Sequence, residues 1–200
     1  MDLAVSRVGD LLEQKVQRQD RLQLYSRDDK DVLQIGPHLL AVNRLAPYKS
    51  WEQFEPQILA ALDSYLSVAK PNGLARIDLR CINRIEIPGP LVNQEEYFDF
   101  YPYLGKKLPQ EIGPYFVGVE FSFVEGRDRL RLEMQSGASE KPDVNTTILG
   151  LDYYCQNSAA FDFAAIRDWL RNAHRALDDV FEGCIRDPLR ELFVAQKALK

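Results

Sequence analysis

Segment 74–87 alternates apolar and polar side chains along its length, and no other pattern constrains the fold as strongly. A period of two is typical of a β-strand with one buried and one solvated face. Asn83 interrupts the apolar side, which predicts a bulge or a buried amide with partners. The apolar side also carries Ala75, Ile77, Leu79, Cys81, Ile85 and Ile87; the other side carries Arg76, Asp78, Arg80, Arg84 and Glu86, with Ile82 among them.

Further strands and helices follow from the same kind of pattern. Short apolar runs separated by turn residues predict a small meander over 21–43. A hairpin is predicted from 115–124 and 129–135, and a further strand over 146–156. Helical spacing predicts long helices near 56–69 and 162–182, and Asp187 followed by Pro188 begins a C-terminal helix over 186–200. A sparse apolar face predicts an N-terminal helix within 1–20.

These elements predict one α+β domain over residues 1–200. With 46% apolar residues in 200, the chain can build its own core. We expect a single, largely antiparallel sheet of about six or seven strands with the long helices packed on one face. Segment 91–114 is predicted to be an irregular, aromatic-rich cover. Its aromatic residues are core, the wall of an apolar pocket, or an exposed protein-binding patch: Tyr97, Phe98, Phe100, Tyr101 and Tyr103.

Composition excludes several classes of function. The net charge is −5 and no run of like charges occurs, so non-specific nucleic-acid binding is not expected. No apolar run is long enough to span a membrane and no apolar leader is evident, which favours a cytoplasmic protein. Cys81, Cys155 and Cys184 are far apart, so neither a disulfide framework nor a zinc site is predicted. Glycine-rich phosphate loops are absent, and we expect no cofactor.

The charged side of the predicted sheet is the main candidate for ligand binding. Several arginines on one face could hold a small anionic ligand such as a phosphate or carboxylate. The simpler interpretation, which we favour, is a solvated face with cross-strand ion pairs. The candidate ligand-binding residues are Arg76, Arg80, Arg84, Arg131, Asp152 and Asn83.

Carboxylates on the same side offer a weaker alternative, a divalent metal and an enzyme acting on nucleic acid or nucleotide. The acids concerned are Asp78, Glu86, Glu120 and Asp152. Their spacing matches no metal or nuclease motif, so we assign no metal ligand and no catalytic residue.

The run Leu79-Arg80-Cys81-Ile82-Asn83-Arg84-Ile85-Glu86-Ile87-Pro88 resembles a strand written LRYINRIEIP in a sporadically distributed family of uncharacterised prokaryotic proteins. Cys81 stands where that family usually has an aromatic residue. Members usually carry a further strand and helix ahead of the region matching residue 22, so the chain looks like an N-terminally short member. The resemblance extends to Leu33-Gln34-Ile35, Val42-Asn43, Tyr48, 51–54, Leu151-Asp152, Trp169-Leu170, Ala173-His174 and Phe181.

The resemblance implies no activity, because none is established for the family. Its patchy distribution is similar to that of genes in mobile or defence-related loci, which is an association only. We therefore favour a non-catalytic interaction or assembly subunit of a prokaryotic multi-protein system, with a protein partner or a homo-oligomer. The alternatives are the anionic-ligand module and the metal-dependent enzyme.

Overall fold

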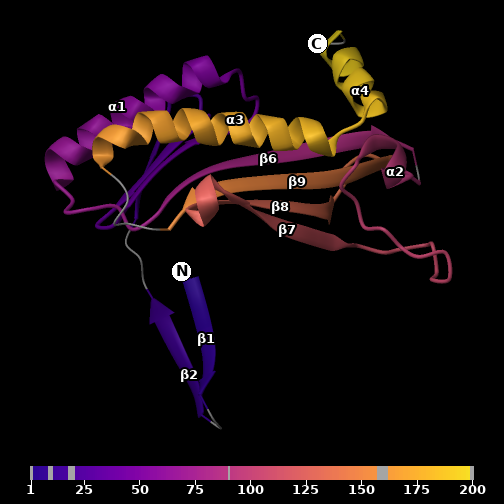
Figure 1. The fold of residues 1–200 in the computed structure, drawn as a ribbon, viewed down its shortest axis with the longest axis horizontal. Helices are drawn as coiled ribbons and strands as arrows, with labels where there is room; N and C mark the ends of the chain where they lie inside the picture. Colours follow the sequence, from indigo (N-terminus) through magenta and orange to yellow (C-terminus); the bar gives the residue numbers. More distant parts are fainter. Residues whose placement is uncertain (1, 9–10, 18–20, 90, 157–161, 199–200) are drawn as a thin grey trace. The chain divides into compact units, whose positions relative to one another are not determined.

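The computed structural model describes residues 2–8, 11–17, 21–89, 91–156 and 162–198 (Figure 1). The chain has an α+β fold and divides into two compact units, residues 1–72 and 73–200. Each is described separately. None of the described helices has both the length and the hydropathy needed to cross a bilayer. The prediction of a single domain stays a prediction.

The first unit opens with a two-stranded hairpin where the sequence predicted a helix. Strands β1 (Asp2–Val8) and β2 (Leu11–Gln17) pair antiparallel, with Leu3 opposite Val16. The predicted N-terminal helix within 1–20 is therefore wrong. The segment has too few apolar residues for a helical face, whereas its dipeptide Gly9-Asp10 is a hairpin-turn signal.

The predicted meander over 21–43 is confirmed as strands β3 (Leu22–Tyr25), β4 (Asp31–Gly36) and β5 (Leu39–Arg44), which pair in that order. Asp31 lies opposite Arg44, and the two form an ion pair of 2.6 Å. Helix α1 (Trp51–Ala69) packs beside β5. It begins five residues before the predicted start and contains Pro56, whose missing N–H leaves one carbonyl of the first turn without its helical partner.

The second unit is built on a four-stranded antiparallel sheet with the order β6-β9-β8-β7. The strands are β6 (Ile77–Pro88), β7 (Phe116–Phe123), β8 (Asp128–Gly137) and β9 (Val144–Cys155). The prediction of a single sheet of six or seven strands is therefore wrong, because the described strands form separate sheets of two, three and four. Alternation along a strand predicts its two faces but does not determine its neighbours.

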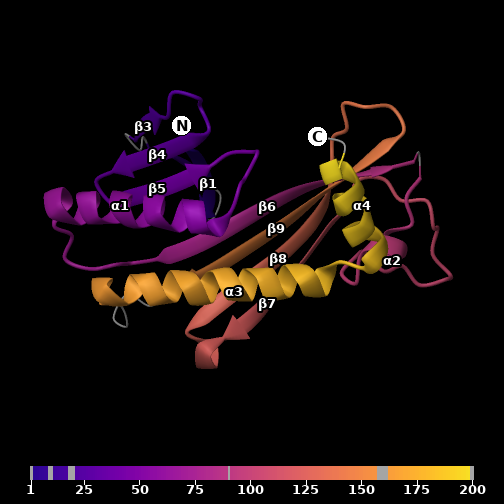
Figure 2. The same ribbon diagram turned by 90° about the horizontal axis from the view of Figure 1, so that it is seen from above.

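Helix α3 (Ile166–Cys184) covers one face of this sheet (Figure 2). Its apolar positions recur at helical spacing and are buried against the sheet, so the pattern that predicted the helix also forms the core. From the helix these are Ile166, Trp169, Leu170, Ala173 and Leu177; from the strands they are Leu79, Ile85, Ile87, Leu130, Leu132, Met134, Leu149, Leu151 and Tyr153.

A short helix and the predicted C-terminal helix complete the second unit. Asn93 caps α2 (Gln94–Tyr97) by accepting a hydrogen bond from the Glu95 N–H at 3.3 Å. Helix α4 spans Asp187–Ala198. Between them, Phe98 is fully buried and forms a β-bridge with Ile185. The aromatic segment is thus partly core, whereas Tyr103 is 75% exposed.

Candidate functional site

The face of the four-stranded sheet opposite α3 carries charged side chains in register across all four strands; we call it the charged face. In one row across the strands, Arg80 lies opposite Asp152, Asp152 lies opposite Arg131, and Arg131 lies opposite Glu120. In the neighbouring row Asp78, Tyr154, Arg129 and Ser122 follow one another in the same way. The period-two pattern of each strand therefore brings the predicted arginines and acids together.

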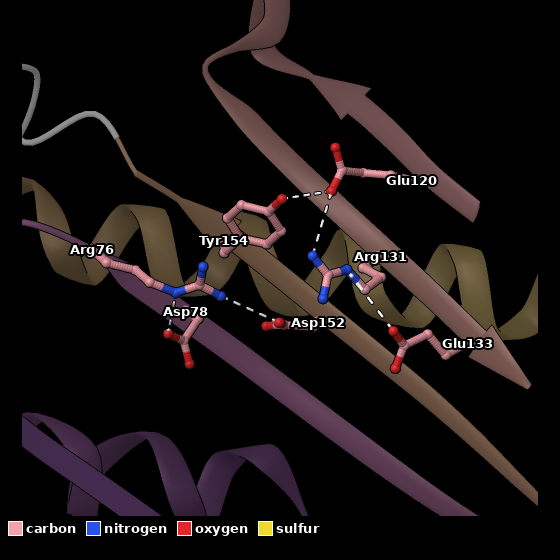
Figure 3. Close-up of polar contacts among 7 residues, drawn as sticks. All are labelled: Arg76, Asp78, Glu120, Arg131, Glu133, Asp152 and Tyr154. Atoms are coloured by element: carbon pink, nitrogen blue, oxygen red, sulfur yellow. Dashed lines mark hydrogen bonds and ion pairs between the residues drawn. The ribbon is translucent and has the colours of Figure 1, made fainter. Parts of the chain in front are cut away.

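Most of the arginines on the charged face form ion pairs with neighbouring acids. Figure 3 shows the pairs of Arg76 and Arg131. Arg76 donates to Asp78 at 3.0 Å and to Asp152 at 3.3 Å, and its guanidinium lies 4.3 Å from the centre of the Tyr154 ring. The Tyr154 hydroxyl donates to Glu120 at 2.6 Å. Pairs of this kind, on a half-exposed surface, stabilise a fold by at most about 1 kcal/mol each.

The remaining pairs extend this network over the face. Arg129 lies 3.3 Å from Glu120, and Arg131 lies 3.9 Å from Glu133. At the far end of β6, Arg84 donates to Glu86 at 3.3 Å and to the Ala138 carbonyl at 2.8 Å. These arginines are held by the protein itself, which weakens the case for a multi-arginine anion site.

Arg80 is the exception. It is exposed, and within the described residues it forms neither a hydrogen bond nor an ion pair. Across the strands it lies opposite Asp152, its register partner. It is therefore the one candidate arginine of this face whose guanidinium is available to a ligand.

Asp152 is the most constrained acid of the face. Its Oδ2 accepts from Arg76, while its Oδ1 is buried and accepts no hydrogen bond from any described residue. Burial and the nearby Asp78 carboxylate raise the pKa of Asp152, although Arg76, Arg80 and Arg131 act in the opposite direction. The net result is a carboxyl group whose charged form is less favoured than that of a solvent-exposed aspartate.

Asn83 does not belong to this group. It lies between Cys81 and Ile85 on the apolar side of β6, the face that α3 covers, and its amide donates to the Leu149 carbonyl at 3.4 Å. Of the two alternatives that the sequence left open, a bulge or an amide with a partner, Asn83 is the second, and its side chain is half-buried. The structure therefore separates Asn83 from Arg76, Arg80, Arg84, Arg131 and Asp152.

Acids on the charged face are held by basic side chains. Among the residues that the structure describes, no group of three or more His, Cys, Asp or Glu side chains is placed to hold a metal ion. Asp78 and Asp152 share Arg76, and Glu86 accepts from Lys141 at 2.6 Å. Each of these carboxylates thus takes part in an ion pair.

A shallow hollow between α2, the end of α3 and the start of α4 is also charged. Its two arginines are paired within the hollow, Arg186 with Asp99 at 2.6 Å and Arg190 with Glu182 at 3.0 Å. The network joins α4 to the neighbouring segments, and among the described residues that line the hollow both arginines are paired.

The outer edge of β7 is a feature that sequence reasoning missed. Within the described residues β7 pairs only with β8, so one side of its backbone has no strand partner. Its eight residues, FVGVEFSF, contain one charge and no proline. On the side that faces α3, Val119 is 37% exposed and Phe121 is 40% exposed. The sequence of β7 predicted a strand, but its position at the edge follows from the strand order, which the sequence pattern does not reveal.

The opposite edge of the same sheet differs. Strand β6 carries Asp78, Arg80, Arg84 and Glu86 and ends at Pro88. Charges and proline are the devices by which natural edge strands avoid pairing with other chains. The β6 edge therefore carries features that oppose pairing with another chain, and we call it guarded; the β7 edge lacks them, and we call it unguarded.

Comparisons with protein-family models, curated proteins and solved structures found no match to this chain. The resemblance based on Leu79–Pro88 stays a prediction. The proposals below therefore rest on the geometry of the sheet.

Proposed function

We propose that this chain is a non-catalytic interaction subunit of an assembly. A partner protein would bind it by adding a strand to the outer edge of β7. The observation that carries the proposal is the unguarded state of that edge. An extended edge with unpaired backbone groups is a ready template for another strand, and protein-recognition domains use this mode of binding.

The backbone pairing indicates which groups of β7 face outward. The Ser136 N–H donates to the Tyr115 carbonyl at 3.2 Å, and Tyr115 continues the register that places Phe116 opposite Gln135. Hydrogen-bonded and non-hydrogen-bonded positions alternate in an antiparallel pair. The odd-numbered residues of β7 therefore bond to β8, while the outward N–H and C=O groups belong to Phe116, Gly118, Glu120 and Ser122.

Two classes of side chain border these groups. On the α3 side, the exposed parts of Val119 and Phe121 offer apolar surface to an added strand. On the charged face, Glu120 is already bound by Tyr154 and Arg129, which reduces but does not remove the repulsion between its carboxylate and an incoming acid. The edge thus combines hydrogen-bonding capacity with an apolar contact.

Site-specific photocrosslinking in the native host tests this proposal. A photoreactive residue at Ser122, which is exposed on β7, should form adducts with a protein that binds at the edge. The same residue at Asn172, exposed on α3, is the matched control and should give few adducts. Equal adducts at both positions, or none at Ser122, would show that the edge is not a binding surface.

Arg80 supports a second candidate, the small anionic-ligand module. Because Arg80 has no ion-pair partner in the described part of the chain, it could bind a phosphate or carboxylate. Titration with pyrophosphate should then give a binding signal that Arg80→Ala removes and Arg129→Ala retains, since Arg129 is held by Glu120. Identical titrations of the two variants would exclude this site.

A further inference from the structure

The structure points to a second copy of this chain as the partner of β7; we infer a two-fold dimer in which the two β7 strands pair antiparallel, centred on Val119. The inference rests on the proposed function, because both use the outer edge of β7. It goes further by naming the occupant and the register.

The outward backbone groups allow such a pairing. In an antiparallel pair about a two-fold axis, the positions of opposite residues have a constant sum. With Val119 opposite its own copy, Gly118 faces Glu120 and Phe116 faces Ser122. All four positions have outward N–H and C=O groups, so they form the hydrogen-bonded pairs, and Val119 is the central non-hydrogen-bonded pair.

The side chains on the α3 side suit this register. Val119 meets Val119 of the second copy, and Val117 meets Phe121 on either side of the axis. These contacts cover the exposed parts of Val119 and Phe121. Aromatic and β-branched residues opposite one another are favourable cross-strand pairs.

The charged face favours the same register. A two-fold axis one residue further along, at Glu120, places two carboxylates directly opposite each other, which is destabilising. With the axis at Val119, each Glu120 faces Gly118, which has no side chain. A Cβ built on Gly118 would already be in van der Waals contact with three atoms at 3.6 Å, so the missing side chain is what leaves room for the facing Glu120.

The length of the strand supports the same centre. With the axis at Val119, residues 116–122 all find partners, which is nearly the whole of β7 (Phe116–Phe123). The result is a continuous eight-stranded sheet whose outer edges are the two β6 strands, with their charges and Pro88. Dimerisation thus removes the unguarded edge and leaves the guarded one.

Sedimentation of the purified full chain across the micromolar range tests whether the dimer forms. We expect a concentration-dependent dimer for the wild type and a monomer for Val119→Lys, because the lysine places two ammonium groups opposite each other at the axis. Ile82→Lys is the control: Ile82 is 62% exposed on β6, away from the β7 edge, and this variant should still dimerise. A monomeric wild type, or Val119→Lys that dimerises like the wild type, overturns the inference.

Cysteine crosslinking tests the register with variants that keep the edge apolar. Cα atoms at a non-hydrogen-bonded pair are about 4.5 Å apart, within the range for a disulfide. Val119→Cys should form an intermolecular disulfide by itself, whereas Val117→Cys and Phe121→Cys should form one only when the two proteins are mixed. The wild type, with its three cysteines, sets the background. A dimer that crosslinks in another pattern overturns the register and with it the inference.

The two proposals can fail separately. If the purified chain stays monomeric while Ser122 in the host crosslinks to a different protein, the second copy is excluded and the interaction function stands. If Ser122 gives no adduct in the host, the proposed function fails, whether or not the purified chain dimerises at high concentration.

Discussion

The hydroxyl of Tyr153 donates a hydrogen bond of 3.0 Å to the carboxylate of Asp128, which is only 1% exposed. The two residues lie on neighbouring strands, β9 and β8. Arg127 completes the carboxylate's environment with hydrogen bonds of 2.8 and 2.7 Å. Burial acts to raise the pKa of Asp128, but these hydrogen bonds and the Arg127 charge outweigh it, so the pKa lies below its usual range.

Asp128→Asn should therefore lower the free energy of unfolding at neutral pH by about 2–3 kcal/mol, since it removes a buried charge from its hydrogen-bonded partners. Tyr153→Phe, which removes one hydrogen bond, should cost about 1 kcal/mol. Denaturant unfolding of the two variants measures both. Equal costs would contradict the role assigned to the charge.

The same pair predicts a pH dependence. Because the folded-state pKa of Asp128 is depressed, its stabilising contribution is complete above its ordinary pKa of about 4 and is lost as the pH falls through the folded-state value. The stability difference between wild type and Asp128→Asn should then narrow as the pH is lowered below about 4. If the stability difference between the wild type and Asp128→Asn stayed constant down to the pH of acid unfolding, the pKa of Asp128 would not be depressed in the folded state.

Asp152 should behave in the opposite way. Its pKa is raised in the folded state, so it favours folding most when protonated and loses that contribution as the pH rises through the folded-state pKa. Asp152→Asn should therefore be at least as stable as the wild type at neutral pH, and this advantage should disappear in acid. Thermal unfolding at several pH values measures this difference in stability, with Glu133→Gln, which alters the acid paired to Arg131, as a control.

The aromatic segment offers a matched pair of truncations. Phe98→Ala should destabilise the protein by about 3–5 kcal/mol, because Phe98 is fully buried beside the bridge to Ile185. Tyr103→Ala should change stability by no more than about 0.5 kcal/mol, because the side chain is exposed. If Tyr103→Ala proved as costly as Phe98→Ala, Tyr103 would have to be part of a packed surface.

Hydrogen exchange of the whole chain tests whether it is one cooperative domain. Among the described residues, the buried apolar side chains of the first unit are Val32 and Leu59, whereas the second unit contains all the others. We therefore expect β4, β5 and α1 to exchange at a lower free energy than β8 and β9. Convergence of all these segments on one value under mild denaturant would instead support the single domain predicted from the sequence.

The sequence was informative where a pattern is local. Alternation in 74–87 predicted both faces of β6, and helical spacing from Ile166 to Leu177 predicted the helix that covers one of them. The N-terminal hairpin was missed because its few apolar residues fit more than one period. Strand order depends on pairing between distant segments, so separate sheets could not be read from any single strand.

The candidate site was predictable to the same extent. Arg76, Arg80 and Arg84 share a face because alternate residues of one extended segment point to the same side, and Asn83 points to the other side. That Asp152 lies on the same face as these arginines depends on the register between β6 and β9. Which arginine is free could not be predicted, because ion pairing depends on the register between strands. The β7 edge was hidden for the same reason: Phe116 to Phe123 suggested a strand from its composition, but not the lack of a neighbour on one side.

The central position of β9 has a consequence for biosynthesis. Among the described strands, β6 pairs with β9 alone, and Ile77 of β6 lies opposite Cys155, at the end of the last of these strands to be synthesised. A nascent chain can form the β7–β8 hairpin early, whereas β6 has no strand partner until β9 leaves the ribosome, and its apolar side stays uncovered until α3 follows. Such late, non-local pairing slows folding and leaves the apolar side chains of β6 exposed during translation, which makes this strand prone to aggregation until its partners are synthesised.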